Sequence, residues 1–95
     1  MKPFRWSPEK GVALRATRGV SFEDIVVAIE SGGLVDIVAH PNQSRYPDQR
    51  VLVVACGGYV HLVPFVEEAE CFFLKTVIPS RKATRDYLKQ GGGDV

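Results

Sequence analysis

The sequence contains few of the residues from which disulfide-linked or metal-binding proteins are built. It has two cysteines and two histidines among 95 residues, and these do not form a cluster with metal-ligand spacing. No apolar run approaches the ~20 residues of a membrane-spanning helix, and residues 1–6 contain no apolar stretch of the kind found in secretory signals. We therefore expect a cytoplasmic protein that uses no metal, no cofactor and no membrane.

A strong charge of one sign is also absent. The formal net charge of +1 at pH 7 argues neither for nor against a nucleic acid partner. The charges are nevertheless segregated along the chain. Residues 1–18 carry five basic side chains and one acidic side chain, and residues 80–90 carry four basic and one acidic. Residues 19–79 between them carry three basic and eight acidic side chains. If the two basic ends pack together, they form one patch that attracts polyanions. The alternative is two ordinary solvated helix faces.

Length and composition are those of one small globular domain. The chain is 45% hydrophobic and 24% charged, which is within the range of globular proteins with one modest core. Internal repeats are absent, and the only low-complexity piece is the glycine run near the C-terminus. We expect a single domain over residues 1–90 and a flexible tail over residues 91–95.

Two helices are predicted in the first third of the chain, after a short edge strand over residues 4–6. Ser7 suits an N-cap with Pro8 in the first turn, and Gly19 suits a C-terminal cap. A second helix begins after Ser21, with apolar residues at helical spacing until a pair of glycines ends it.

Four β-strands are predicted next, over residues 34–39, 50–56, 59–66 and 71–78. Adjacent glycines between the second and third strands are a hairpin signal that pairs Cys56 with Tyr59. The next turn then places Cys71 opposite Val66. The two cysteines would lie at opposite ends of the sheet, roughly 20 Å apart at ~3.3 Å per residue, so we expect reduced thiols.

One face of this sheet is predicted to face the helices. In the proposed register that face carries Leu52, Val54, Cys56, Tyr59, His61, Val63, Phe65, Phe72, Leu74, Thr76 and Ile78. Pro64 cannot donate a ladder bond, which predicts a bulge or a local edge at that point. The element order predicts an α+β fold, with a short strand, two helices, a four-stranded mostly antiparallel meander and a C-terminal helix.

Two polar segments stand out as candidate binding regions. The loop over residues 40–49 is long for a hairpin connection, which is typical of functional loops. His40 at its start is a candidate phosphate-binding residue, although a His-Pro step is also ordinary turn chemistry. After the last strand, Ser80 suits an N-cap and is followed by a basic segment. Cations at a helix start oppose the helix dipole, so Arg81 and Lys82 indicate an anionic partner such as phosphate.

Four local motifs occur in a recognisable order. They are Phe4-Arg5-Trp6-Ser7 with Lys10, Thr17-Arg18-Gly19-Val20-Ser21-Phe22-Glu23-Asp24, Arg50, and Pro79-Ser80-Arg81-Lys82-Ala83-Thr84. Together they resemble the BrnT family of bacterial toxins, small ribonucleases with a RelE-like fold that are encoded beside a DNA-binding antitoxin. The resemblance spans about residues 4–87. Ser7, Leu14 and Arg18 replace the family's aspartate, asparagine and histidine, so the chain resembles a divergent branch.

The resemblance implies a toxin of a type II toxin–antitoxin system that cleaves RNA without a metal. The catalytic candidates are Arg50, Arg81, Lys82 and Arg85. Guanidinium groups can form bidentate hydrogen bonds to phosphate and stabilise negative charge in the transition state. The phosphate-binding candidates are Lys10, Arg18 and His40. The implied partners are RNA and an antitoxin of the ribbon-helix-helix type, with a homo-oligomer or a heterotetramer with antitoxin as possible assemblies.

Other interpretations of the same residues stay open. The chain could be a catalytically inactive subunit that docks the antitoxin, which the loss of the family histidine favours, or a nucleic-acid adaptor without a toxin role. Arg50 could instead pair with Asp48 or Asp36. His61 lies among apolar residues and is expected in the core or at its rim, and Tyr87 is expected to pack the last helix, although its hydroxyl could donate a proton.

Overall fold

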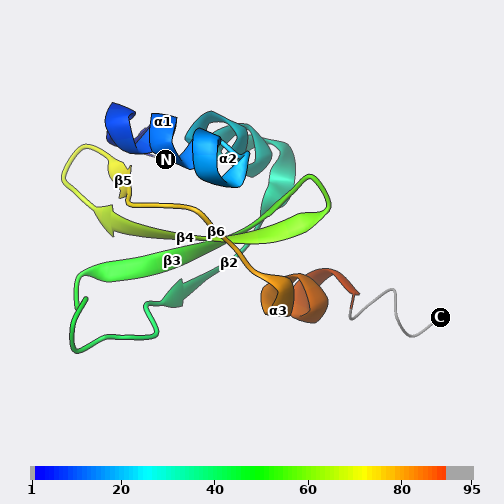
Figure 1. Cartoon of the computed structure of the whole chain (residues 1–95). Coiled ribbons are helices and arrows are strands. Elements are labelled where there is room, and N and C mark those ends of the chain that lie inside the picture. The colour runs from blue at the N-terminus through cyan, green and yellow to red at the C-terminus, as the bar shows by residue number, and fades with distance from the viewer. Residues whose placement is uncertain (1, 90–95) are drawn as a thin grey trace.

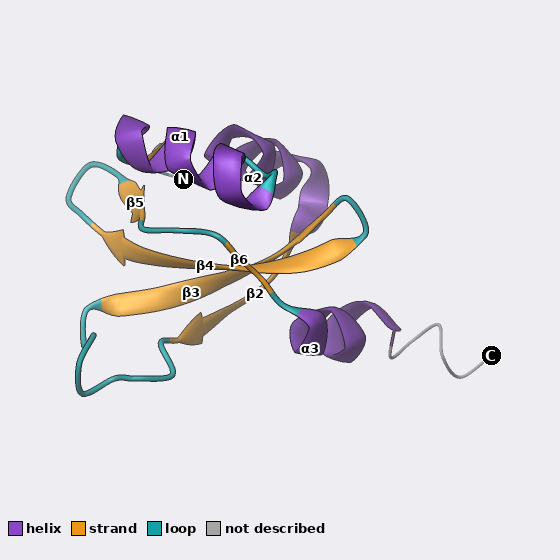
Figure 2. Ribbon diagram, viewed as in Figure 1, coloured by secondary structure: helices purple, strands orange, loops and turns teal. Residues whose placement is uncertain are grey.

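The computed structural model describes residues 2–89, so the predicted tail over residues 91–95 lies outside the described residues. Figures 1 and 2 show two helices over one face of a β-sheet and a third helix near the C-terminal end of the chain. The elements are β1 (Phe4–Arg5), α1 (Pro8–Arg18), α2 (Phe22–Ala28), β2 (Leu34–Ala39), β3 (Gln49–Cys56), β4 (Tyr59–Glu67), β5 (Phe72–Leu74), β6 (Ile78–Pro79) and α3 (Arg81–Thr84), with π-helical turns η1 (Ile29–Gly33) after α2 and η2 (Arg85–Lys89) after α3.

The sheet has six strands in the order β1-β5-β4-β3-β2, with β6 paired to β4. Strands β2 to β5 form an antiparallel meander, and β1 lies parallel to β5 at one edge. The predicted α+β class and meander are therefore confirmed. Within the described part of the chain, no helix has the length and apolar character needed to cross a membrane.

Helix ends form where short-range hydrogen bonding predicts them. The Ser7 hydroxyl accepts a bond from the Lys10 amide at 3.4 Å, and Gly19 ends α1 in the left-handed conformation with φ 68°, which glycine adopts without strain. Ser21 and Asp24 form a reciprocal capping box at the start of α2, with bonds of 3.0 and 3.2 Å. These caps place α1 and α2 across one face of the sheet.

The hairpin between β4 and β5 is tighter than predicted. The structure confirms the pairing of Cys56 with Tyr59, but β4 continues to Glu67 and pairs there with Phe72. The Glu68 amide donates to the Cys71 carbonyl at 2.8 Å, so the predicted pairing of Cys71 with Val66 is wrong by two residues. A two-residue slip leaves every side chain on its predicted face. Both cysteines are free.

Pro64 interrupts the last predicted strand, which divides into β5 and β6. The Lys75 amide donates to the Pro64 carbonyl at 2.8 Å, but proline has no N–H to return the bond, and the ladder stops. Pairing resumes with Leu62 opposite Ile78, one residue out of register with β5. The predicted irregularity at Pro64 is thus confirmed, whereas a continuous strand over residues 71–78 is wrong.

This shift reverses the facing of the side chains after β5. Thr76 and Ile78 were predicted to face the helices, but Val77 is the residue that enters the core, with no exposed surface, while the Ile78 side chain is 39% exposed. A one-residue slip exchanges the two faces of a strand because side chains alternate. The core under α1 and α2 otherwise contains the predicted face residues Leu52, Val54, Val63, Phe65 and Leu74.

The opposite face of the sheet holds a second, smaller cluster. Val53 and Val60 pack there against Ala83 of α3, with Leu62 beside them. The sheet is therefore covered by α1 and α2 on one face and, over part of its area, by α3 on the other. Helices α1 and α2 are separated from α3 by the thickness of the sheet.

Candidate nucleic-acid interface

Helix α3 is held on β4 by a set of hydrogen bonds, of which the bond between Val60 and Thr84 is buried. The Ser80 amide donates to the Val60 carbonyl at 2.9 Å, and the Val60 amide donates to the Thr84 hydroxyl at 2.8 Å. That hydroxyl in turn donates to the Ser80 carbonyl at 2.7 Å, and the Ser80 hydroxyl caps the helix by accepting from the Ala83 amide at 3.0 Å. These bonds fix where the basic residues of α3 project.

We expect Thr84→Val to destabilise the protein by about 1–3 kcal/mol, because it leaves the buried Val60 amide without a partner. Thr84→Ser is the matched control, since it keeps the hydroxyl and loses one methyl group, worth about 1 kcal/mol or less. Urea denaturation followed by circular dichroism measures both. Equal destabilisation by the two variants would show that the methyl group, and not the hydrogen bonds, matters.

The basic motif therefore divides into anchoring and exposed residues. Ala83 and Thr84 are buried, whereas Arg81, Lys82 and Arg85 are exposed. Arg85 lies 3.8 Å from the neighbouring Asp86, and both side chains are more than half exposed, so this contact stabilises little. The helix thus presents its cations to solvent.

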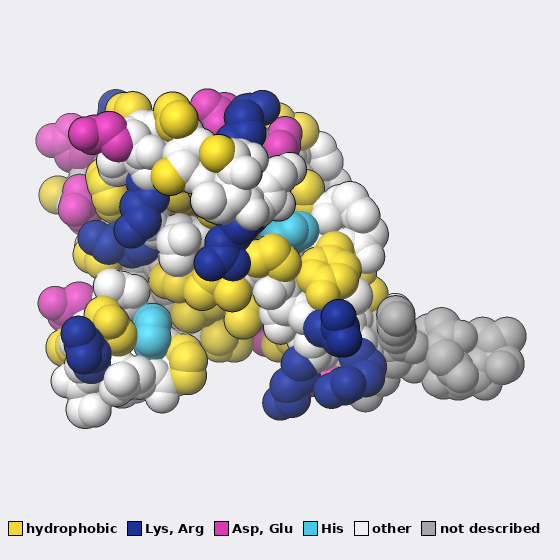
Figure 3. Space-filling view, viewed as in Figure 1, with side chains coloured by type: hydrophobic (Ala, Val, Ile, Leu, Met, Phe, Trp, Pro, Cys, Tyr) yellow, Lys and Arg dark blue, Asp and Glu magenta, His cyan; other side chains and the backbone are white. Residues whose placement is uncertain are grey.

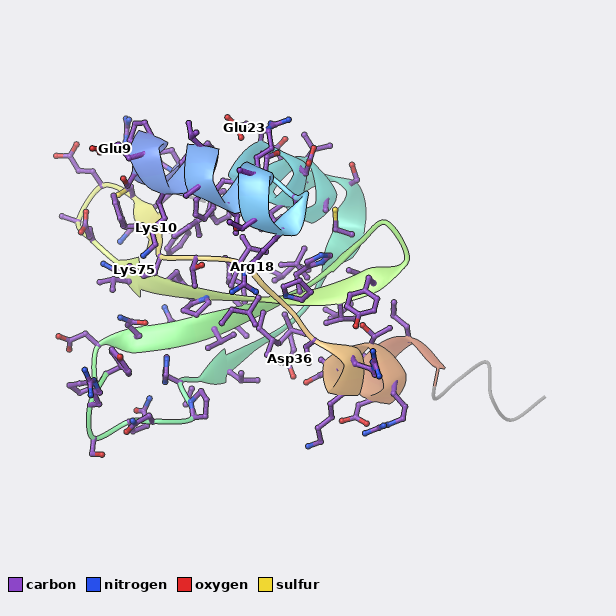
Figure 4. The ribbon with its side chains drawn as sticks, viewed as in Figure 1. Glu9, Lys10, Arg18, Glu23, Asp36 and Lys75 are labelled. Carbon is purple, nitrogen blue, oxygen red and sulfur yellow. The ribbon has the colours of Figure 1, made fainter. Side chains whose placement is uncertain are left out.

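A second group of cations comes from α1 and from the segment between β5 and β6. Figure 4 shows Lys10 and Arg18 on α1, and Lys75 after β5, in front of the sheet. The Lys75 ammonium lies 5.3 Å from the centre of the Phe73 ring. In the same view, Figure 3 shows basic side chains in two groups, one over α1 and one over α3, with apolar and uncharged surface between them.

We use the name basic face for both groups together. It is defined by five residues: Lys10, Arg18, Lys75, Arg81 and Lys82. Among residues 2–89, no carboxylate lies within 4.0 Å of any of these five. The chain from Lys75 to Ser80 connects β5 to α3 (Figure 1), so it leads from the region beside α1 to the opposite side of the sheet, where α3 packs. Sequence reasoning missed Lys75, because it lay inside a strand predicted to be continuous.

Arg50 is separated from the basic residues of α3. It shares the α1/α2 face of the sheet with Leu52, whereas α3 packs on the opposite face. Along β4, its partner Phe65 is five positions from Val60, where α3 docks, which is roughly 16 Å. The structure therefore separates Arg50 from the three basic residues at Arg81, Lys82 and Arg85.

Arg50 forms an ion pair that the sequence did not indicate. Its Nη2 atom lies 2.8 Å from Oε1 of Glu67, so pairing with Asp48 or Asp36 is wrong. Arg50 is opposite Phe65, which makes Glu67 its diagonal neighbour on the same face of the ladder. The hydrogen bond from Lys2 is the main cause that lowers the pKa of Glu67. The positive charges of Lys2 and Arg50 lower this pKa further.

His40 organises the loop that it begins. Its Nδ1 atom accepts a bond from the Asn42 amide at 3.0 Å, its carbonyl accepts from the Gln43 side chain at 3.0 Å, and its ring lies 4.7 Å from the ring of Tyr46. These contacts match the turn interpretation of the His-Pro step. One imidazole nitrogen is thereby used inside the loop.

Two further polar residues have perturbed proton affinities. Burial lowers the pKa of His61, which is 7% exposed, as expected for a core or rim histidine, and its Nδ1 atom has no hydrogen-bond partner among the described residues. The Tyr87 hydroxyl donates to Asp36 at 2.9 Å. This bond is the main cause that raises the pKa of Tyr87, so the phenol holds its proton more strongly than usual.

No protein-family model matches the chain, and neither a curated protein nor a solved structure matches it. The candidate interface therefore rests on this chain's own residues: one group of cations on α1 and at Lys75, a second group on α3, and Arg50 paired with Glu67.

Proposed function

We propose that this chain is a toxin of the BrnT type that binds RNA through the basic face and cleaves it without a metal. The observation that carries the proposal is the presence of five cations without carboxylate partners among the described residues, in two groups over α1 and α3 (Figure 3), on a protein whose net charge is only +1. A polyanion with regularly spaced charges is the ligand that such a surface attracts.

Arg81, Lys82 and Arg85 are the proposed catalytic cations. In metal-free cleavage, the 2′-hydroxyl of RNA attacks the neighbouring phosphate and the 5′-oxygen leaves, so negative charge builds up on the phosphorus-bound oxygens. Exposed guanidinium and ammonium groups can stabilise that charge. Lys10, Arg18 and Lys75 would hold the flanking phosphates.

We expect purified wild-type protein to cleave total RNA in the presence of EDTA, and the Arg81→Ala/Lys82→Ala variant to lose at least 100-fold of the rate, because removing a preorganised charge from a transition state has this effect. Gel electrophoresis of the products measures the rate. An Arg45→Ala variant is the control, since it removes an exposed cation from the loop that His40 begins and should cleave normally.

A second function is favoured by the position of Arg50. One of the four predicted catalytic residues is ion-paired to Glu67 on the other face of the sheet, which fits a subunit that binds RNA or docks an antitoxin without cleaving. RNA binding without cleavage in the same assay would support this alternative over the first. Growth arrest relieved by a small adjacent gene would support the toxin.

A further inference from the structure

A small apolar cavity lies on the α1/α2 face of the sheet, and none of the five basic-face residues lines it. It has a volume of about 160 Å³. Its walls include three aromatic rings, Phe4, Phe65 and Phe72, and the exposed side chain of Ile37 on the edge strand β2. Arg50 and Glu67 complete it, and their side chains are 47% and 44% exposed, so they form its solvent-facing side.

The volume of the cavity matches one six-membered ring. Engineered protein cavities of about 150 Å³ that are lined by apolar side chains stay dry and bind benzene. The ring centres of Phe4 and Phe65 each lie 5.7 Å from that of Phe72, with Phe65 and Phe72 edge to face. These walls therefore offer both ring faces and ring edges, which is the environment that a further aromatic ring prefers.

The charges beside the cavity favour an anion. Glu67 is contacted by two cations, Lys2 at 2.8 Å and Arg50 at 2.8 Å, so the cluster has a net positive charge. The Arg50 guanidinium lies 5.0 Å from the centre of the Phe65 ring. The guanidinium donates one hydrogen bond to Glu67 among the described residues. Its other N–H groups can donate to a carboxylate or phosphate.

We propose that this cavity is a binding site for a small planar anion, meaning one six-membered aromatic ring that carries a carboxylate or a phosphate group. The ring enters between the phenylalanine side chains, and the anionic group contacts Arg50. Two classes of compound combine such a ring with an anionic group: free aromatic acids and pyrimidine nucleotides. The site does not depend on RNA binding, because none of the five basic-face residues lines it.

The test uses benzoate and uridine monophosphate as probes in separate NMR titrations of the ¹⁵N-labelled chain. We expect saturable shifts of the Ile37, Leu52 and Phe65 amides. Ile37→Phe should fill the cavity and weaken binding at least tenfold. Val35→Phe is the matched control, because Val35 is 41% exposed on the same strand and does not line the cavity; it should bind normally.

Arg50→Gln separates the apolar part of the site from its charge. We expect this variant to bind both anions at least tenfold more weakly and to bind neutral benzyl alcohol as the wild type does. Binding of both anions supports the shared chemistry, and binding of one alone identifies its source. The proposal is overturned if neither probe shifts these amides, or if Ile37→Phe and Val35→Phe bind a probe equally well.

Discussion

Val77→Asp is expected to unfold the protein, whereas Ile78→Asp should leave it folded. Val77 has no exposed surface and packs in the core under α1 and α2, while Ile78 is 39% exposed. Burying an unpaired carboxylate costs several kcal/mol, and a loss above ~4 kcal/mol removes most of the stability of a small domain. The exposed carboxylate at position 78 stays hydrated.

The same pair of positions tests the register of β6 directly. A continuous strand from residue 71 to residue 78 would place Ile78 inside and Val77 outside, so it predicts the opposite order of stabilities. Far-ultraviolet circular dichroism and urea denaturation distinguish the two registers. If Val77→Asp gives no folded material, the milder pair repeats the test: Val77→Ala should cost on the order of 2 kcal/mol, and Ile78→Ala well under about 1 kcal/mol.

Neutralising the basic face should lower the affinity for single-stranded RNA by on the order of 100-fold or more at low salt. Each phosphate contact contributes about −0.7 to the slope of log affinity against log salt concentration for single strands. Five contacts therefore predict a slope near −3.5 for the wild type. A variant with all five side chains changed to alanine should lose this contribution and keep at most that of Arg85, about −0.7. Fluorescence anisotropy with a labelled oligonucleotide, repeated over a salt series, measures both quantities.

A single substitution tests whether Lys75 belongs to this surface. Lys75→Ala should make the salt slope shallower by about 0.7, because it removes one phosphate contact. Arg45→Ala removes an exposed cation from the loop that His40 begins, and the slope should be unchanged. Equal effects of the two substitutions would mean that RNA responds to total charge, and the basic face would then have no special role.

Local chemistry explains why the helix ends were predictable. Ser7, Gly19, Ser21 and Ser80 all act at the predicted ends. A capping side chain bonds to a backbone group only three residues away, so the residues that decide the outcome are adjacent in the sequence. The helix start at Ser80, which places Arg81 and Lys82 in the first turn, was predicted for the same reason.

The sheet register and the composition of the site depended on contacts between distant residues. Pro64 indicated an irregularity, but not that the chain would resume pairing one residue out of register. The partner of Arg50 is seventeen residues away, on a neighbouring strand. Lys75 follows β5 directly, and its ammonium lies over the Phe73 ring.

The sequence by itself determined the α+β class, the order of the elements, the helix caps and the segregation of basic residues to the two ends. Only the tertiary structure decided that α3 packs on the face of the sheet opposite α1 and α2, that Arg50 is paired with Glu67 on the α1/α2 face and that Val77 is in the core. The physical reason is the separation along the sequence between the residues that interact. Caps and turns are settled by hydrogen bonds within a few residues, whereas register follows from bonds such as Lys75 to Pro64 and Val60 to Thr84, which form only when the chain has folded.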